Sequence, residues 1–223
     1  MELALTMAGS LRPLLELTRP RVVAMVVFTA LPVLLWGPLP TVGDALAALA
    51  GTLLVAAGNS ALNAWVERDR DARMARTRSR PLPSGRLPAG TALGWALAIT
   101  GAGLAILPPA AAAIALATTV IYVGAYTAWL KPRSAHNTVV GAVAGAAAPL
   151  IVDAALRGSP GVAGWVCFAV VFAWQMPHTW AIALYRAEEY AAAGIVMMPA
   201  VVGPAATRRR MLAWAIALLG VSL

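Results

Sequence analysis

Residues 63–86 read NAWVERDRDARMARTRSRPLPSGR, a stretch that combines three acids and seven arginines in an otherwise apolar chain. Asn63, Glu67 and Asp71 follow one another at intervals of four residues. If a helix continues through them, their oxygen-bearing side chains share one face, with about 6 Å of rise per step. Such oxygens suit Mg²⁺, which proteins usually hold by one or two carboxylates together with substrate phosphates. We therefore expect a metal site on this face, with Asp69 out of register.

The arginines that follow suit the phosphates themselves, because a guanidinium can donate to two phosphate oxygens at once. A carboxylate face beside an arginine cluster predicts a site for a metal diphosphate. A plainer interpretation stays open: the arginines mark the cytoplasmic end of a membrane helix, and the acids pair with them on a solvated loop.

Composition places the chain in the membrane. It is 61% hydrophobic and 12% charged, with a mean hydropathy of +0.77, which excludes a water-soluble domain. Pro108 and Pro109 divide the longest uncharged run into two spans. The uncharged runs thus predict six spans, and they cover residues 22–43, 45–66, 87–130, 134–152 and 158–185. We expect a seventh helix to begin near Met211 and to be incomplete at Leu223.

The net charge of +8 follows the membrane topology. With the N-terminus in the cytoplasm, every Lys and Arg except Arg157 falls in a cytoplasmic segment. This bias explains the positive net charge, so that no nucleic-acid partner is needed to account for it. It predicts an integral protein of the cytoplasmic (inner) membrane, with the N-terminus and the charged loops on the cytoplasmic side.

The order of residues in 63–86 resembles the first acidic motif of the UbiA-type intramembrane prenyltransferases, usually N-D-x-x-D-x-x-x-D. Asn63 and Asp71 match, Glu67 stands in for an Asp, and Ala64 replaces the second-position Asp. The following R-T and R-P-L are similar to the branch that farnesylates haem. The resemblance implies catalytic and metal-binding roles for Asn63, Glu67 and Asp71. It implies that diphosphate is bound by Arg76 and Arg80.

The second charged loop, residues 126–137, reads YTAWLKPRSAHN and resembles the family's Y-T-x-x-L-K-R-x-T-x-x-N. Pro132 interrupts the basic pair of that motif. The resemblance implies that Lys131 and Arg133 also hold diphosphate oxygens. A topological role alone would equally explain two cations at this place.

The stretch 172–190, FAWQMPHTWAIALYRAEEY, is similar to the W-Q-x-P-H motif of the haem-farnesylating branch. His178 stands where most of the wider family has an Asp, and histidine can ligate haem iron or bind a propionate. The resemblance implies that Trp174, Gln175 and His178 contact the acceptor. The alternative is that His178 is a structural residue of the helix bundle, hydrogen-bonded to a backbone carbonyl. Glu188 and Glu189 could hold a second metal or pair with the arginines of the first loop.

Together these resemblances imply an all-α, polytopic transmembrane helix bundle with one domain over 1–223, shortened at its C-terminus relative to the nine helices of the family. The implied reaction is farnesyl diphosphate + haem B + water → haem O + diphosphate, with Mg²⁺ as cofactor. Its partners are the two substrates and the lipid bilayer, and no sequence feature identifies a haem A synthase or oxidase-assembly partner.

Three other functions remain open. A related enzyme could prenylate an aromatic quinone precursor, although His178 in place of Asp argues against it. A non-catalytic haem-binding subunit would explain His178 but not the shared face of Asn63, Glu67 and Asp71. A transporter or channel would need charged residues in the middle of its spans, and the predicted spans contain none.

Overall fold

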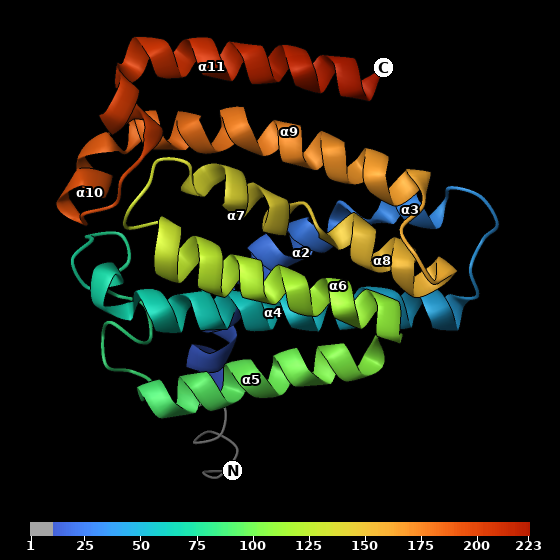
Figure 1. Cartoon of the computed structure of the whole chain (residues 1–223). Helices are drawn as coiled ribbons and strands as arrows, with labels where there is room; N and C mark the ends of the chain where they lie inside the picture. The colour runs from blue at the N-terminus through green and yellow to red at the C-terminus, as the bar shows by residue number, and fades with distance from the viewer. Residues whose placement is uncertain (1–10) are drawn as a thin grey trace.

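The computed structural model describes residues 11–223 as an all-helical bundle (Figure 1). A helix over Leu11–Thr18 precedes the labelled elements. These are α2 (Pro20–Phe28), α3 (Leu31–Leu34), α4 (Val42–Asp71), α5 (Ala89–Ile106), α6 (Pro109–Thr119), the π-helix η1 (Val120–Leu130), α7 (Asn137–Gly145), α8 (Ala148–Arg157), α9 (Val162–Tyr185), α10 (Ala187–Ala192) and α11 (Met198–Ser222).

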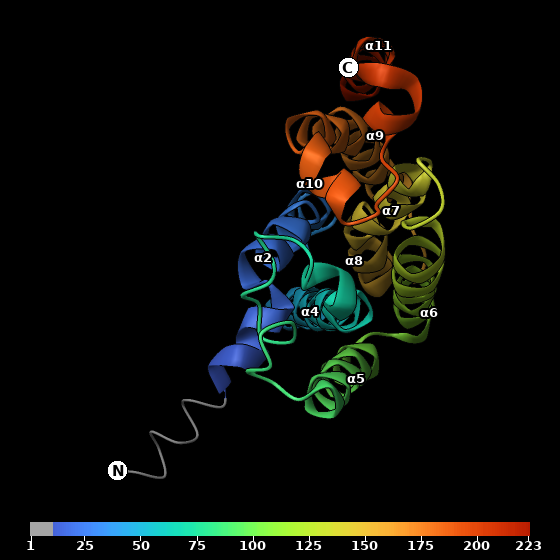
Figure 2. The ribbon, with the colours of Figure 1, turned by 90° about the vertical axis from the view of Figure 1, so that its left-hand side faces the viewer.

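The long helices run side by side, with α5 on one flank of the bundle and α11 on the other (Figure 1). Between them, α4 packs on α5 and α8, and α9 packs on α8 and α11. The end of α4, the connection 72–88 and α10 all lie at one end of the bundle, which we call the loop end. Figure 2 views the molecule from this end.

The contact between α4 and α5 depends on glycines that let the two backbones approach closely. A Cβ atom on Gly103 would lie 2.8 Å from the carbonyl oxygen of Gly51, and one on Gly58 would lie 1.9 Å from Thr100 Oγ1. Small residues at such positions are the usual means of packing helices in membranes. The contact holds α4 along its length and so fixes where Asp71, its last residue, lies.

Five helical segments are long and apolar enough to cross a membrane, or six if the bent pair Leu11–Thr18 and Pro20–Leu34 counts as one. The other five are Val42–Asp71, Ala89–Ile106, Pro109–Leu130, Asn137–Arg157 and Val162–Tyr185. The predicted runs thus correspond to helices, although the first run, 22–43, is helical only as far as Leu34 before α4 begins at Val42, and two of the membrane segments are not straight. The first pair bends by 40°. The segment Asn137–Arg157 breaks between Gly145 and Ala148, with Pro149 in the first turn of α8.

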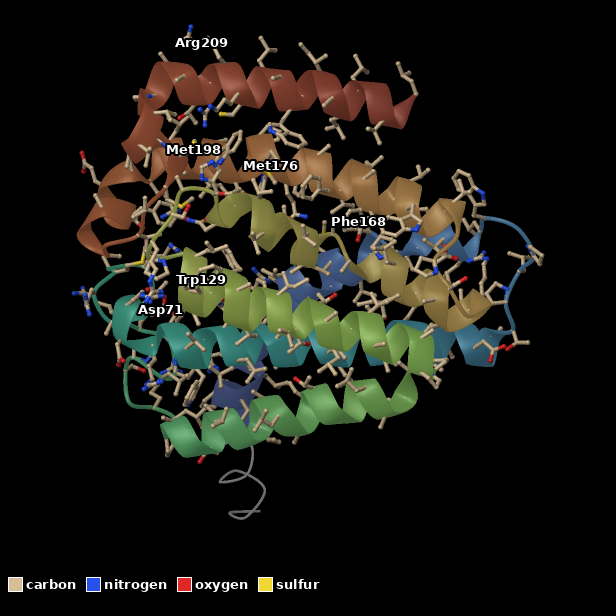
Figure 3. All side chains as sticks on the ribbon, viewed as in Figure 1. Asp71, Trp129, Phe168, Met176, Met198 and Arg209 are labelled. Carbon is tan, nitrogen blue, oxygen red and sulfur yellow. The ribbon has the colours of Figure 1, made fainter. Side chains whose placement is uncertain are left out.

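The last helix begins earlier than its apolar residues indicate. It starts at Met198 instead of near Met211, and it turns sharply at Gly203, where φ is 79°. The helix therefore includes the three arginines Arg208, Arg209 and Arg210, which the hydropathy pattern had placed in a preceding loop. Figure 3 shows Arg209 on the outer side of α11.

A second charged cluster lies at the opposite end of the bundle. Asp153 is fully buried in α8 and accepts hydrogen bonds from the backbone N–H groups of Gly161 and Gly164, at 2.8 and 2.9 Å. It also pairs with Arg157, whose guanidinium donates to the carbonyl oxygen of Val33 at 3.2 Å. Sequence reasoning ended this span at residue 152 and so left Asp153 outside it. Its contacts join α8 to the start of α9 and to α3, which is a structural role.

Candidate functional site

The predicted face of α4 is present. The helix runs unbroken through Asn63, Glu67 and Asp71, which are only 1%, 4% and 5% exposed. Asp69 lies outside this face, with 77% of its side chain exposed beside Arg68. Burial of two carboxylates at the end of a membrane helix is costly unless they are paired or bind a cation. We call these three residues the carboxylate face.

Each member of the carboxylate face contacts a cation from a different segment. Arg19 Nη2 donates to Asn63 Oδ1 at 3.2 Å. Lys131 Nζ lies 2.5 Å from Glu67 Oε1. Arg80 Nη1 donates to Asp71 Oδ2 at 2.7 Å. Arg19 precedes α2, Lys131 follows η1, and Arg80 lies in the connection 72–88. The three cations therefore meet only in the folded bundle.

The π-helix η1 sets the orientation of Asn63. Thr127 is fully buried, and its hydroxyl donates to the carbonyl of Tyr122, five residues earlier, at 2.7 Å. The same hydroxyl accepts from Asn63 Nδ2 at 3.0 Å, which leaves Asn63 Oδ1 to face Arg19. Each backbone hydrogen bond of a π-helix spans five residues instead of four, and such helices are frequent at functional sites. Lys131 follows directly, and Figure 3 shows Trp129 at the same end of the bundle as Asp71.

Arg19 is a site residue that sequence reasoning missed. Its backbone is left-handed, with φ 49° and ψ 60°, and it is the one non-glycine residue with positive φ in the described range 11–223. Such a conformation costs on the order of 1–3 kcal/mol and tends to occur at functional sites. The signal was the following Pro20, which disfavours a helical conformation at Arg19 and so breaks the first span there.

The cations crowd one another. Burial, followed by the charge of Arg19, lowers the pKa of Arg80, and the charge of Arg76 acts in the same direction. Burial also acts to lower the pKa of Lys131, but Tyr126 and Glu67 outweigh it, so that its pKa is raised and the ammonium stays charged. Cations held this close favour an anion between them. The arrangement suits a polyanion such as a diphosphate.

The donor set also fits a hard metal ion that completes its shell with phosphate oxygens. Among residues 11–223, three or more His, Cys, Asp or Glu side chains nowhere cluster as a full metal cage. Two carboxylates and an amide oxygen suffice for Mg²⁺ only when substrate phosphates supply further ligands. Glu67 Oε1 is buried against Lys131, and because a carboxylate can accept several contacts at once, this ion pair leaves acceptor capacity for a metal.

The remaining charged candidates lie elsewhere. Arg133 donates to the carbonyl of Trp129 at 2.8 Å and so satisfies the end of its own helix. Glu188 is exposed. Glu189 accepts from Arg186 at 2.9 Å and lies 3.7 Å from Arg76 Nε. Pairing of Glu189 with an arginine of the first loop, one of the two sequence-based alternatives, is therefore what the structure contains.

The three residues predicted to contact the acceptor point to different sides of α9. Trp174 and His178 are exposed and stack on each other, with ring centroids 4.4 Å apart and planes 16° apart. Gln175 instead turns towards α7, where its Nε2 donates to the carbonyl of Ala142 at 3.3 Å. Met176, labelled in Figure 3, is fully buried and forms part of the core between α9 and α7. The stacked pair thus presents a flat aromatic surface that Gln175 does not share.

Comparison with known proteins gives a consistent result. The model of the UbiA prenyltransferase family matches residues 23–223. A protoheme IX farnesyltransferase from Methylobacterium radiotolerans is 43% identical, over 99% of this chain and 72% of the relative. Protoheme IX farnesyltransferase 1 from Mesorhizobium japonicum is 44% identical, over 93% of this chain and 68% of the relative.

Solved structures share the fold. A UbiA homologue from Archaeoglobus fulgidus, bound to DMAPP and Mg²⁺, superposes with a TM-score of 0.72 at 17% identity, covering 93% of this chain and 75% of that one. The apo UbiA homologue from Aeropyrum pernix gives a TM-score of 0.75 at 19% identity, covering 90% of this chain and 76% of that one. At these sequence identities the similarity shows that the helices are arranged in the same fold. We infer the chemistry from the site residues of this chain.

Proposed function

This chain belongs to the UbiA prenyltransferase family, and we propose that it transfers a farnesyl group from farnesyl diphosphate to a vinyl group of haem B. The products are haem O and diphosphate, with water added to give a hydroxyethylfarnesyl side chain. The protein is an integral membrane protein and a prenyltransferase. The acceptor is assigned from the protoheme IX farnesyltransferases that are 43% and 44% identical to it.

One observation carries the catalytic part of the proposal: each of the three oxygen-bearing side chains of the carboxylate face contacts a cation from a separate segment. Glu67 and Asp71, with Asn63, would hold Mg²⁺ when the diphosphate is bound. The metal would neutralise negative charge that develops on the departing diphosphate.

The chain's own cations have two roles in this scheme. Before the substrate binds, Arg19, Lys131 and Arg80 act as counter-ions for the carboxylate face. When diphosphate enters, they donate to its oxygens, and they stabilise it most when the allylic carbon–oxygen bond breaks and charge collects on the leaving group. Arg76 is near enough to influence Arg80, but we leave it out of this group because it contacts Glu189.

The acceptor side of the proposal rests on α9. Trp174 and His178 form a flat, exposed surface on a membrane helix, which suits the face of a large ring such as haem. His178 would contact the iron or a propionate. Gln175 would act through its bond to α7 by holding α9 in place.

We place the protein in the cytoplasmic membrane as a single prenyltransferase domain, with the loop end on the cytoplasmic side. Support comes from the positive residues, which collect at this end, as expected from the usual bias of membrane topology. Arg157, the single cation predicted on the other side, lies in the buried cluster with Asp153 at the opposite end of the bundle.

The test is to incubate membranes that contain the protein with haem B, labelled farnesyl diphosphate and Mg²⁺, and to follow label into haem O. Asp71→Ala membranes with equal amounts of inserted protein serve as the control. Label in haem O from the wild type alone supports the proposal. Label in an added aromatic quinone precursor, with none in haem O, would refute haem as the acceptor. Haem binding without any transfer would favour a haem-binding subunit.

A further inference from the structure

A cavity of about 560 Å³ that is open to the surface lies at the loop end of α9, and none of its lining residues belongs to the carboxylate face. Two arginines and two tyrosines share its lining with two apolar residues; the six are Arg76, Ala181, Ile182, Tyr185, Arg186 and Tyr190. Its volume falls within the range of small-molecule sites, which are mostly apolar with a few placed polar groups. We call it the Arg76–Arg186 cavity.

The two arginines already share a carboxylate. Arg186 Nη1 donates to Glu189 Oε1 at 2.9 Å, and Arg76 Nε lies 3.7 Å from Glu189 Oε2. Oε2 itself has no hydrogen bond within the described residues. A guanidinium carries five N–H donors, and the single bond from Arg186 to Glu189 leaves most of them available. Two cations against one acid give the cavity a surplus of positive charge.

The cavity and the stacked rings of Trp174 and His178 lie along the same face of α9. Residues 174, 178, 182 and 185 recur at helical spacing and so share one face of α9. Trp174 and His178 form the exposed stack, while Ile182 and Tyr185, one to two turns further on, line the cavity. A ligand that covers this face would therefore meet aromatic rings first and two arginines at the loop end.

We propose that the Arg76–Arg186 cavity binds a carboxylate of the acceptor, and so selects a flat apolar ring that carries acidic side chains. The inference rests on the proposed function and deepens it: in haem B the matching groups are the propionates. A planar carboxylate is the group to which guanidinium donates in bidentate fashion. Arg76 thereby binds the acceptor. The diphosphate is bound by Arg19, Arg80 and Lys131.

The proposal is tested by titrating the purified protein in phosphatidylcholine nanodiscs with haem B and, separately, with haem B dimethyl ester, whose propionates are blocked. Binding is followed at the Soret band. The wild type should bind haem B at least roughly tenfold more tightly than the diester, as expected for one charge-assisted contact. This comparison needs no variant and therefore does not depend on any variant folding.

Arg76→Gln and Arg186→Gln should each bring the two affinities close together, chiefly by weakening haem B. Arg78→Gln makes the same charge change two residues from Arg76, at an exposed position outside the cavity, and should keep the wild-type ratio. Binding of farnesyl diphosphate with Mg²⁺ should persist in Arg186→Gln. An equal fall in diphosphate binding would assign Arg186 to the donor and overturn the inference.

Two further outcomes separate this inference from the proposed function. Equal affinity of the wild type for haem B and its diester, while haem O is still formed, overturns the carboxylate site alone. Failure of the wild type to bind either ring, together with absence of haem O, overturns both. If adding phosphatidylglycerol stabilises the wild type but not Arg186→Gln, and the ester makes no difference, the cavity holds a lipid headgroup and the inference is wrong.

Discussion

Lys131→Met removes the cation next to Glu67 and keeps a side chain of similar length. Both partners are largely buried, with side-chain exposures of 16% for Lys131 and 6% for Glu67, and the atoms in contact are 2.5 Å apart. Removal of one partner from a buried ion pair typically costs about 3–5 kcal/mol, because the other charge is left without compensation. For a chain of this size that corresponds to a fall in melting temperature on the order of 10 °C.

The double variant Glu67→Gln/Lys131→Met separates stability from catalysis. It removes both charges and should recover part of the lost stability, with a coupling energy of about 1–3 kcal/mol between the two sites. It should not recover activity. Each single variant and the double variant should lower kcat/KM for farnesyl diphosphate by roughly 10²–10³-fold, since a group aimed at the leaving-group charge is lost.

The assay pairs heat-induced loss of the monomer, followed by size-exclusion chromatography in detergent, with haem O formation at a temperature at which all variants are folded. If Lys131→Met melts like the wild type and keeps its kcat/KM, Lys131 is neither counter-ion nor diphosphate ligand. If the double variant regains activity along with stability, the pair has a structural role only, and the account of the carboxylate face is wrong.

Four other variants test three separate parts of the account. Asp71→Ala should abolish transfer while insertion is retained, whereas Asp69→Ala, at an exposed position, should stay near wild type; similar losses in both would contradict the register of the face. His178→Ala should weaken haem B binding and lower haem O formation while sparing farnesyl diphosphate binding, and unchanged haem affinity would make His178 a packing residue. Asp153→Ala should destabilise the protein by about 3–5 kcal/mol because Arg157 and two backbone N–H groups lose their acceptor; an unaltered melting temperature would refute this role.

The carboxylate face could be predicted because it depends only on local geometry. A helix that continues through residues four apart must place them on one side, and the same rule puts Asp69 outside. The apolar runs predicted the positions of the helices for a similarly simple reason, since a span must be long and uncharged. Both predictions use information contained within a single helix.

The partners of that face could not be predicted in the same way. Arg133 and Lys131 are two residues apart in one basic loop, yet the first contacts its own helix end and the second contacts Glu67. The π-helix before them decides which side chain reaches α4, and hydropathy carries no signal for it. Arg19 reaches Asn63 through a left-handed backbone next to a break. Such contacts depend on how separate segments meet.

Irregular helices explain the remaining differences. The sequence contains the prolines and glycines that break α2 from the preceding helix, α7 from α8 and α11 at Gly203. It does not indicate whether a given proline ends a span or only bends it, because neighbouring helices can satisfy the backbone groups that are freed. Asp153 fell outside the predicted span for a related reason: a charge was taken as an end, although its partners allow it to be buried.

The central claim is that Glu67 and Asp71 hold a metal together with the diphosphate, and it is tested most directly by magnetic resonance. Mn²⁺ replaces Mg²⁺, and an unreactive thio-analogue of farnesyl diphosphate supplies the phosphorus nuclei. The account predicts bound Mn²⁺ with a hyperfine coupling to ³¹P in the wild type, and loss of that coupling in both Glu67→Gln and Asp71→Asn. An undiminished ³¹P coupling in both variants would contradict it, because the metal diphosphate would then bind without the carboxylate face.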